Sequence, residues 1–396
     1  MTTQVATQNS LLGVYRPAAP VFVSGSGRHL VARDGRTYLD FTSGIGVNAL
    51  GYADAGIAAA MQTAIETGVV HTSNLFRTEP CVDLAGLLTS HSFAQRVFFC
   101  NSGAEANEAA FKFARKYARS SAEAGGEAEK HEIVALRGAF HGRLFGALAA
   151  TDRPSMQQPF EPLMPGVQFI TPGDVAEAAA VISAAKTAAV IVEPIQGEGG
   201  IQPLSAEYVA KLRELTDAAG ALLIFDEVQC GLGRTGRLFA YEWLGVVPDM
   251  VTLAKPLAGG LPMGAVLMTE AVASVMVPGD HATTFGGGPF VSAVALEVVS
   301  RISDPSFLAE VRARGHQLET GLREIASKRA IKEVRGVGLM WGMELDQPAA
   351  PVVAAAMENG LLVISAGERV LRLLPALNIE PGEIAEGLSI LEEVLS

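Results

Sequence analysis

The stretch Ala221–Gly264 constrains the fold most strongly, because it holds two short apolar runs that each end in a chemically useful side chain. The runs Ala221–Phe225 and Met250–Ala254 are bounded by turn residues and are too short for typical helices, which predicts two buried strands. Asp226 follows the first run and Lys255 follows the second. Because ligands bind outside the carboxyl ends of strands in an open parallel α/β sheet, this pattern predicts a site there.

Lys255 differs from the other lysines in its surroundings. It closes an apolar run and is followed by a glycine-rich segment, whereas most of the others lie among polar residues. Partial desolvation at such a place would lower the pKa of the amine and make its neutral form available. A neutral amine can form a Schiff base with an aldehyde such as that of pyridoxal phosphate. A lysine that merely pairs with a carboxylate is the alternative, and this window alone does not separate the two.

Composition and charge exclude several classes of protein. The 396 residues are 49% hydrophobic and only 18% charged, which is typical of a large globular enzyme of two or more domains. The net charge of −12 and the absence of a basic run argue against nucleic-acid binding. No apolar stretch is long enough to cross a bilayer, and the first residues do not resemble a signal peptide. The three cysteines lack metal-ligand spacing and suit a cytoplasmic location.

The order of predicted elements divides the chain into three parts. Residues 1–55 contain an antiparallel meander and are expected to pack with the C-terminal part. Residues 56–305 alternate strands and helices, which predicts a mainly parallel sheet with right-handed crossovers. Residues 306–396 are expected to form a smaller α+β domain. The predicted strands of the middle part are Arg96–Cys100, Glu132–Leu136, Val167–Ile170, Ala188–Val192 and the two runs named above.

Two glycine-containing loops invite a phosphate ligand, and only one of them is credible. Asn101–Ala104 joins a predicted strand to a long helix, whose first amides would suit a phosphate; capping by Ser102 is the alternative. Gly231–Gly236 matches a dinucleotide fingerprint by letter. The acidic pair before it would repel a pyrophosphate and no convincing helix opens after it, so a mobile loop is expected instead.

Several polar or aromatic side chains near the predicted strand ends have two readings each. Asp226 either pairs with a positively charged pyridine nitrogen or caps a turn, and Phe140 either lies on a ring or fills the core. Arg143 and Arg372 are candidates for binding substrate carboxylates, since arginine binds them bidentately. Arg372 lies in an apolar run, where an unpaired charge is costly. Glu198, in a glycine-rich run, is a further candidate for handling substrate carboxylates.

Taken together, these stretches resemble the class III aminotransferases, pyridoxal-phosphate enzymes of fold type I, and among them most closely the acetylornithine aminotransferases. The resemblance covers roughly residues 10–390. It is carried by the segments FFCNSGAEANEAAFKFAR, FHGRLFGALAAT, VIVEPIQGEGG, LLIFDEVQCGLGRTG, TLAKPLAGGLPMGA and PGDHATTFGGGP. The implied fold is a large domain with a mainly parallel seven-stranded sheet flanked by helices, and a smaller α+β domain.

The resemblance implies a role in cofactor binding for each residue that matches a family motif. Lys255 would be the catalytic lysine bound to pyridoxal phosphate, and Asp226, supported by Glu193, would pair with the pyridine nitrogen. Gln229 would approach the ring hydroxyl and Phe140 would stack on the ring. The complete implied set is Ser102, Gly103, Ala104, Phe140, Glu193, Asp226, Glu227, Val228, Gln229, Lys255 and Thr284, with no metal ligand.

The implied substrate contacts explain how one pocket accepts two partners. Arg143 would bind the α-carboxylate, while Glu198 would shield Arg372 during one half-reaction. Tyr15 is expected to line the pocket. Thr283 and Thr284 would reach the site of a neighbouring subunit, which implies a homodimer with shared sites.

The reaction implied by the resemblance moves the δ-amino group of N-acetylornithine to 2-oxoglutarate, giving N-acetylglutamate 5-semialdehyde and glutamate. Succinylornithine, ornithine, 4-aminobutyrate or a carrier-bound lysine are alternative donors. An aminomutase on the same scaffold and a nucleotide-binding protein using Gly231–Gly236 are the other classes considered. Two places depart from the family pattern: Gly288 replaces asparagine, and Tyr52–Gly56 replaces a histidine-containing run.

Overall fold

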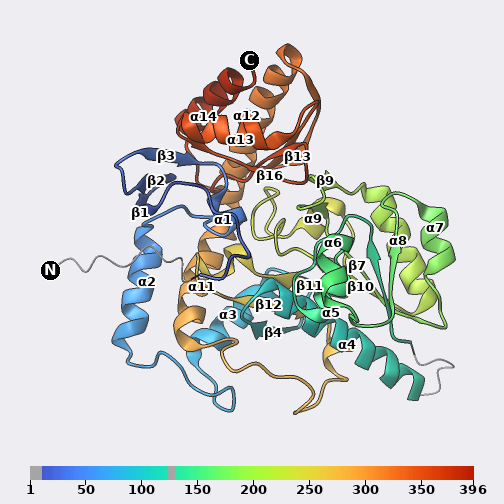
Figure 1. Ribbon diagram of the computed structural model, residues 1–396. Coiled ribbons are helices and arrows are strands. Elements are labelled where there is room, and N and C mark those ends of the chain that lie inside the picture. Colours follow the sequence, from blue (N-terminus) through green and yellow to red (C-terminus); the bar gives the residue numbers. More distant parts are fainter. Residues whose placement is uncertain (1–10, 124–129) are drawn as a thin grey trace.

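A seven-stranded sheet forms the centre of the molecule in the computed structural model, which describes residues 11–123 and 130–396 (Figure 1). Its strand order is β4-β12-β11-β10-β7-β5-β6, and β11, β10, β7, β5 and β6 pair in parallel. The prediction of a mainly parallel sheet is therefore confirmed. The strands are β4 (Arg96–Cys100), β5 (Glu132–Leu136), β6 (Val167–Ile170), β7 (Thr187–Val192), β10 (Leu222–Asp226), β11 (Met250–Leu253) and β12 (Gly264–Met268).

Strand β12 was not predicted, and it runs antiparallel to both of its neighbours. Its apolar residues come after a proline- and glycine-rich segment. No turn signal follows them, so the sequence does not separate them from the next helix. In the register of the sheet, Gly264 at the start of β12 lies opposite Cys100 at the end of β4. The segment that leads into β12 therefore lies at the same edge of the sheet as the ends of the parallel strands.

Helices cover this sheet, and their ends follow local sequence signals. In α8 (Ala206–Ala219), Ser205 accepts a hydrogen bond from the amide of Tyr208, and Gly220 ends the helix in a left-handed conformation with φ 58°. The long helix α4 (Gly103–Glu123) starts directly after β4. The others are α2 (Ala55–Glu66), α3 (Glu79–Ser90), α7 (Val175–Val181) and α11 (Pro289–Ile302), together with the short helices α1 (Ser43–Gly46), α5 (Phe145–Ala149), α6 (Pro154–Gln157), α9 (Ala240–Leu244) and α10 (Glu270–Ala273).

The C-terminal part forms a second, antiparallel sheet with the order β13-β14-β17-β16, drawn in orange to red in Figure 1. Its elements are α12 (Pro305–Lys328), β13 (Ile331–Val337), β14 (Met340–Leu345), α13 (Ala349–Glu358), β16 (Ile364–Ser365), β17 (Val370–Leu373) and α14 (Pro381–Val394). Helix α13 was not predicted.

The N-terminal meander joins this C-terminal part. Its strands are β1 (Phe22–Ser26), β2 (His29–Ala32) and β3 (Thr37–Asp40), and β3 pairs in parallel with β15 (Leu361–Leu362). The domain boundaries at residues 55 and 305 remain predictions. A small two-stranded ribbon, β8 (Ile195–Gln196) and β9 (Gln202–Pro203), lies between β7 and β10 in sequence and brackets Glu198.

The departure from the family pattern at residues 52–56 has a structural explanation. The Tyr52 hydroxyl donates to Asp40 Oδ2 at 2.6 Å. Asp54 caps α2 through the amide of Ile57 and binds both terminal nitrogens of Arg301 on α11, at 2.6 and 3.0 Å. The run therefore fixes α2 against α11. Within the part of the chain that the structure describes, no helix has the length and apolarity needed to cross a membrane.

The expectation of a mobile loop at Gly231–Gly236 is wrong. All six residues are buried, and Arg234 donates to the carbonyl oxygens of Leu339 and Pro375 in the C-terminal part. Glycine is needed for close approach, because a Cβ at Gly233 would stand 2.8 Å from Ile302. The next helix, α9, begins only at Ala240, so no helix amides face a ligand at Gly236.

Candidate active site

A cavity of about 460 Å³ lies where the strands of the large sheet end, and we call it the strand-end cavity. Segments after β4, β5, β7, β10 and β11 contribute to it, as does the segment that leads into β12. Its lining includes Asn101, Ser102, Gly103, Ala104, Asn107, Phe140, His141, Gly142, Arg143, Glu193, Asp226, Val228, Gln229 and Lys255. The sheet thus brings together most of the predicted site residues from distant parts of the sequence.

The start of α4 forms one wall of the strand-end cavity. The Ser102 hydroxyl caps the helix by accepting a hydrogen bond from the amide of Glu105 at 3.2 Å, and Ser102 also lines the cavity, so phosphate binding there remains a prediction. A Cβ at Gly103 would stand 2.7 Å from Val228, so only glycine permits this approach. The unpaired amides and positive dipole end of this long helix suit an anion such as a phosphate.

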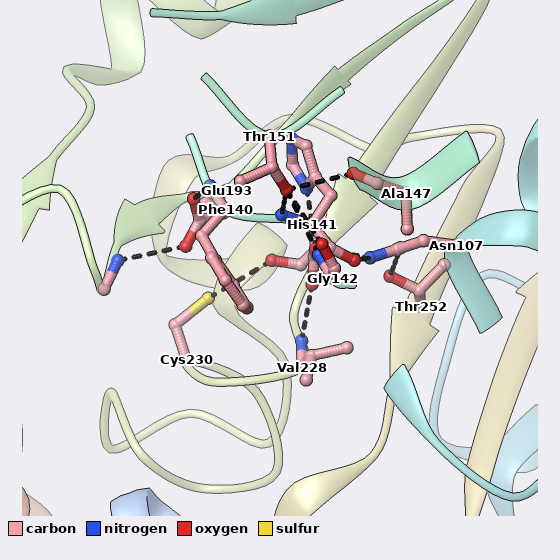
Figure 2. A network of polar contacts seen from close by, with 12 residues as sticks. Asn107, Phe140, His141, Gly142, Ala147, Thr151, Glu193, Val228, Cys230 and Thr252 are labelled. Atoms are coloured by element: carbon pink, nitrogen blue, oxygen red, sulfur yellow. Dashed lines mark hydrogen bonds and ion pairs between the residues drawn. The ribbon is translucent and has the colours of Figure 1, made fainter. Parts of the chain in front are cut away.

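Asp226 is the centre of a buried polar network, and its partners Asn107, His141 and Val228 are labelled in Figure 2. Its Oδ2 accepts from Asn107 Nδ2 and from His141 Nδ1, both at 2.8 Å, and its Oδ1 accepts from the amide of Val228 at 3.0 Å. Asn107 in turn accepts from the Thr252 hydroxyl at 2.8 Å. The Asp226 side chain is therefore held in one orientation, with donors from three separate segments.

Asn107 and His141 are the two functional residues that the sequence analysis missed. Asn107 lies inside α4, where an isolated polar residue is usually taken to face solvent, yet it is 1% exposed. His141 directly follows Phe140, and its position after a buried strand was the available signal.

Glu193 supports Phe140 rather than Asp226. Its two oxygens accept from the amides of Phe140 and Gly197, at 2.9 and 3.0 Å. Burial raises the pKa of Glu193 to about 7, with the nearby Asp226 adding to the rise and His141 opposing it. This carboxyl group therefore fixes two segments at the rim of the cavity.

Lys255 follows β11 directly and lines the strand-end cavity. Burial lowers the pKa of its amine, and the charge of Arg372 acts in the same direction, while Asp226, Glu198 and Glu193 oppose the shift. The direction predicted from its position at a strand end is thus confirmed. Its backbone adopts φ 26°, which is uncommon for a residue with a side chain.

Arg372 and Glu198 form the predicted ion pair. Arg372 Nη1 donates to Glu198 Oε1 at 2.5 Å and to Gln229 Oε1 at 3.2 Å. The Arg372 side chain is 3% exposed, whereas that of Glu198 is 32% exposed. Gln229 lines the cavity, so it links the ion pair to the site. The structure thus places Gln229 both against an arginine and in the lining of the cavity.

Arg143 is exposed at the cavity mouth, and its guanidinium carbon lies 5.8 Å from the centroid of the Phe140 ring. A cationic side chain over the edge of a cavity is suited to receiving a carboxylate from solution. Phe140 lines the cavity on the side of Glu193.

Six predicted residues do not line the strand-end cavity within the described part of this chain, and two of them, Glu198 and Arg372, form the ion pair described above. Glu227 is 1% exposed and instead accepts from the amides of Ala240 and Tyr241, so its assignment to the cofactor is corrected to capping of α9. Tyr15 is 84% exposed. Thr283 accepts from Asn101 Nδ2 at 2.9 Å, and Thr284 is exposed.

Comparison with known proteins agrees with this geometry. The family aminotransferase class-III matches residues 15–395. An acetylornithine aminotransferase from Alnus glutinosa is 48% identical over 97% of this chain and 85% of its own length. A succinylornithine transaminase from Yersinia pseudotuberculosis is 46% identical over 96% of this chain and 93% of its own. The solved structure of the ornithine aminotransferase from Toxoplasma gondii, with pyridoxal phosphate at its active site, superposes with a TM-score of 0.92 at 30% identity, covering 98% and 92% of the two chains.

The matched family spans nearly the whole chain, the fold agrees, and Lys255 and the fixed carboxylate of Asp226 line one cavity. The chain therefore belongs to the class III aminotransferases, a family of pyridoxal-phosphate-dependent enzymes.

Proposed function

We propose that this enzyme transfers the δ-amino group of N2-acetyl-L-ornithine to 2-oxoglutarate, giving N-acetyl-L-glutamate 5-semialdehyde and L-glutamate. The observation that carries the proposal is the ion pair between Glu198 and Arg372 beside Gln229, which lines the cavity that holds Lys255. Relatives whose names state this activity cover nearly the full chain.

The residues of the strand-end cavity fit pyridoxal phosphate. The first amides of α4 would hold its phosphate, Phe140 would lie on its ring, and Asp226 would face its ring nitrogen. Gln229 and Val228 would lie beside the ring. When bound, the cofactor supplies an electron sink for the charge left on a carbon that loses a proton.

Lys255 is the group that can move that proton. It lines the cavity, and burial lowers the pKa of its amine, which favours the neutral form that accepts a proton. In the proposed reaction, Lys255 Nζ would take the proton from the δ-carbon of the donor and pass it to carbon C4′ of the cofactor, and it would move a proton in the opposite direction in the half-reaction with 2-oxoglutarate. Asn107 and His141 hold the Asp226 carboxylate in one orientation, so it would stabilise a protonated ring nitrogen of the cofactor without having to move.

The ion pair lets one pocket serve substrates with different numbers of carboxylates. Arg143 can bind a carboxylate of either substrate. Arg372 is needed only for the second carboxylate of 2-oxoglutarate, and Glu198 neutralises it while the donor is bound. An unpaired buried cation would be costly. The intact ion pair therefore favours binding of the donor, and binding of 2-oxoglutarate is favoured when Glu198 turns away from Arg372.

Related donors remain alternatives within the same chemistry. Succinylornithine is favoured by the 46% identical relative of that name, and ornithine, 4-aminobutyrate or a carrier-bound lysine would use the same amine position. An aminomutase would not need 2-oxoglutarate, so the placement of Arg372 argues against it. A nucleotide-binding role has no support, because Gly231–Gly236 is buried.

We also propose a homodimer in a reducing, cytoplasmic setting. Thr284 and its neighbour Phe285, which is 64% exposed, lie on an exposed loop near the exposed apolar residues Leu75 and Phe76. A second subunit covering this surface would bury them and bring Thr284 to the neighbouring phosphate. Free thiols at all three cysteines suit a reducing compartment.

A donor panel tests the proposed reaction. Purified enzyme with pyridoxal phosphate and 2-oxoglutarate should form glutamate fastest with N-acetylornithine, compared with succinylornithine, ornithine and 4-aminobutyrate. Lys255→Ala serves as the control for uncatalysed transfer. A strong preference for 4-aminobutyrate, or no glutamate from any acylated ornithine, would overturn the assignment.

A further inference from the structure

The segment around Glu198 rests on the sheet of the C-terminal part, and we call residues 196–201 the Glu198 loop. In the register of that sheet, Arg335 on β13 lies opposite Gly342 on β14, and Gly342 lies opposite Arg372 on β17. Directly opposite residues share a face of a sheet. The two arginines therefore flank Gly342 in one row on one face of the sheet. Arg372 contacts the side chain of Glu198, and Arg335 contacts the backbone of the Glu198 loop.

Arg335 holds the far end of the loop. Its Nε donates to the carbonyl oxygens of Gly200 and Ile201, at 2.9 and 3.1 Å. Its Nη1 donates to Glu333 and Glu344, at 2.6 and 2.7 Å, and the side chain is only 8% exposed. The planar guanidinium thus binds two carboxylates and two backbone carbonyls at once, and the single ammonium group of lysine cannot reproduce this geometry.

Gly342 gives the loop its place between the two arginines. A Cβ at Gly342 would stand 2.9 Å from Cβ of Ile201, so the glycine admits the isoleucine. Ile201 is fully buried and has φ 52°, a conformation that β-branched residues rarely adopt. Such strain persists only where surrounding contacts enforce it, and it gathers at switch regions.

The other side of the loop is held by the large domain. Arg153 Nη2 donates to the carbonyl oxygen of Glu198 at 3.0 Å, and Gly197 donates to Glu193. The loop is rich in glycine, yet its backbone is bonded at both ends and in the middle. Within the described contacts, the freedom that remains at Glu198 is rotation of its side chain.

We propose that Arg335 is a positioning residue that sets substrate discrimination. By fixing the carbonyls of Gly200 and Ile201, it determines where the Glu198 carboxylate stands relative to Arg372. Loosening this hold weakens the Glu198–Arg372 pair, leaves Arg372 open, and favours partners with two carboxylates over partners with one. The proposal rests on the proposed function of the same site and extends it to a residue that lies outside the strand-end cavity.

The test compares Arg335→Gln with a matched control, Lys332→Met. Lys332 lies on the same strand and binds the same Glu344, at 3.1 Å, but within the described residues it makes no hydrogen bond or ion pair with the Glu198 loop. Half-reactions with N-acetylornithine and with glutamate are followed separately from the absorbance of bound pyridoxal phosphate. Arg335→Gln should raise the glutamate preference roughly 3- to 10-fold, in the range expected for a residue acting through another. Lys332→Met should leave the preference unchanged.

A double-mutant cycle shows whether Arg335 acts through Glu198. In a Glu198→Ala background, Arg335→Gln should have no further effect on the preference, because the carboxylate it positions is gone. In an otherwise wild-type enzyme, Arg335→Lys should shift the preference for glutamate less than Arg335→Gln does, without restoring the wild-type preference. The proposal is overturned if Arg335→Gln slows both half-reactions equally, or if its effect on the preference is as large without Glu198.

A second variant keeps the test independent of folding defects. Gly342→Ala should displace Ile201 and shift the preference in the same direction, with circular dichroism and thermal unfolding reporting the fold. An unchanged preference in folded Gly342→Ala would also count against the proposal. Failure of the proposed reaction would appear differently, as wild-type enzyme that does not react with N-acetylornithine; the same comparison then uses the best donor from the panel.

Discussion

Replacement of Asn107 by leucine tests the network behind Asp226. Leucine has a similar shape, so the change removes polar contacts with little change in volume. Asn107 donates to Asp226 at 2.8 Å and to the His141 carbonyl at 2.7 Å, and accepts from Thr252 at 2.8 Å. A hydrogen bond to a charged group contributes about 1.5–3 kcal/mol. If the bond acts by orienting Asp226, its loss should slow the donor half-reaction about 10- to 100-fold.

The matched control is Thr252→Val, which leaves the bond between Asn107 and Asp226 intact. Both variants leave a buried polar group unpaired and should lower the free energy of unfolding by about 1–3 kcal/mol for each such group. Only Asn107→Leu should slow the chemistry strongly, as followed by single-turnover absorbance of bound cofactor. Equal slowing in the two variants, or a wild-type rate in Asn107→Leu, would refute the reasoning.

Three further outcomes are expected. Lys255→Ala should fold and bind cofactor but lose at least ~10²–10⁴-fold in turnover, the usual contribution of a proton-transfer group; near-wild-type turnover would remove Lys255 from the mechanism. Burial raises the pKa of Glu227 from 4.5 to about 8, so the folded state keeps a proton that the unfolded chain releases, and stability should fall as pH rises through this window. Glu227→Gln should flatten that fall in thermal unfolding; an unchanged pH profile would contradict it. If Thr284 serves the neighbouring site, mixing Lys255→Ala with Thr284→Ala subunits should restore some activity after subunit exchange, and no recovery despite confirmed exchange would argue against sharing.

The reactive ends of the strands could be predicted from sequence because they depend on local pattern. Short apolar runs ending in Asp226 and Lys255 identify buried strands and place both residues at one edge of a parallel sheet. The apolar run around Arg372 also indicated that its charge needs a partner, whereas the choice of Glu198 as that partner came from the family resemblance.

Features that depend on tertiary contacts were not predictable in this way. Asn107 is a polar residue in a helix, and only the packed structure shows that it faces Asp226. Glycine content suggested mobility at Gly231–Gly236 and around Glu198, whereas buried arginines fix both segments. Glu227 belonged to the cofactor set implied by the resemblance, but successive side chains on an extended backbone point in opposite directions, and its carboxylate accepts from the amides at the start of α9.

The most direct test of the account measures the two half-reactions separately in Glu198→Ala and Arg372→Ala. Glu198→Ala should expose Arg372 and increase the use of glutamate relative to N-acetylornithine. Arg372→Ala should spare the reaction with N-acetylornithine and weaken the reaction with 2-oxoglutarate. If both variants slow both half-reactions by the same factor, the ion pair is structural and does not switch between the two substrates.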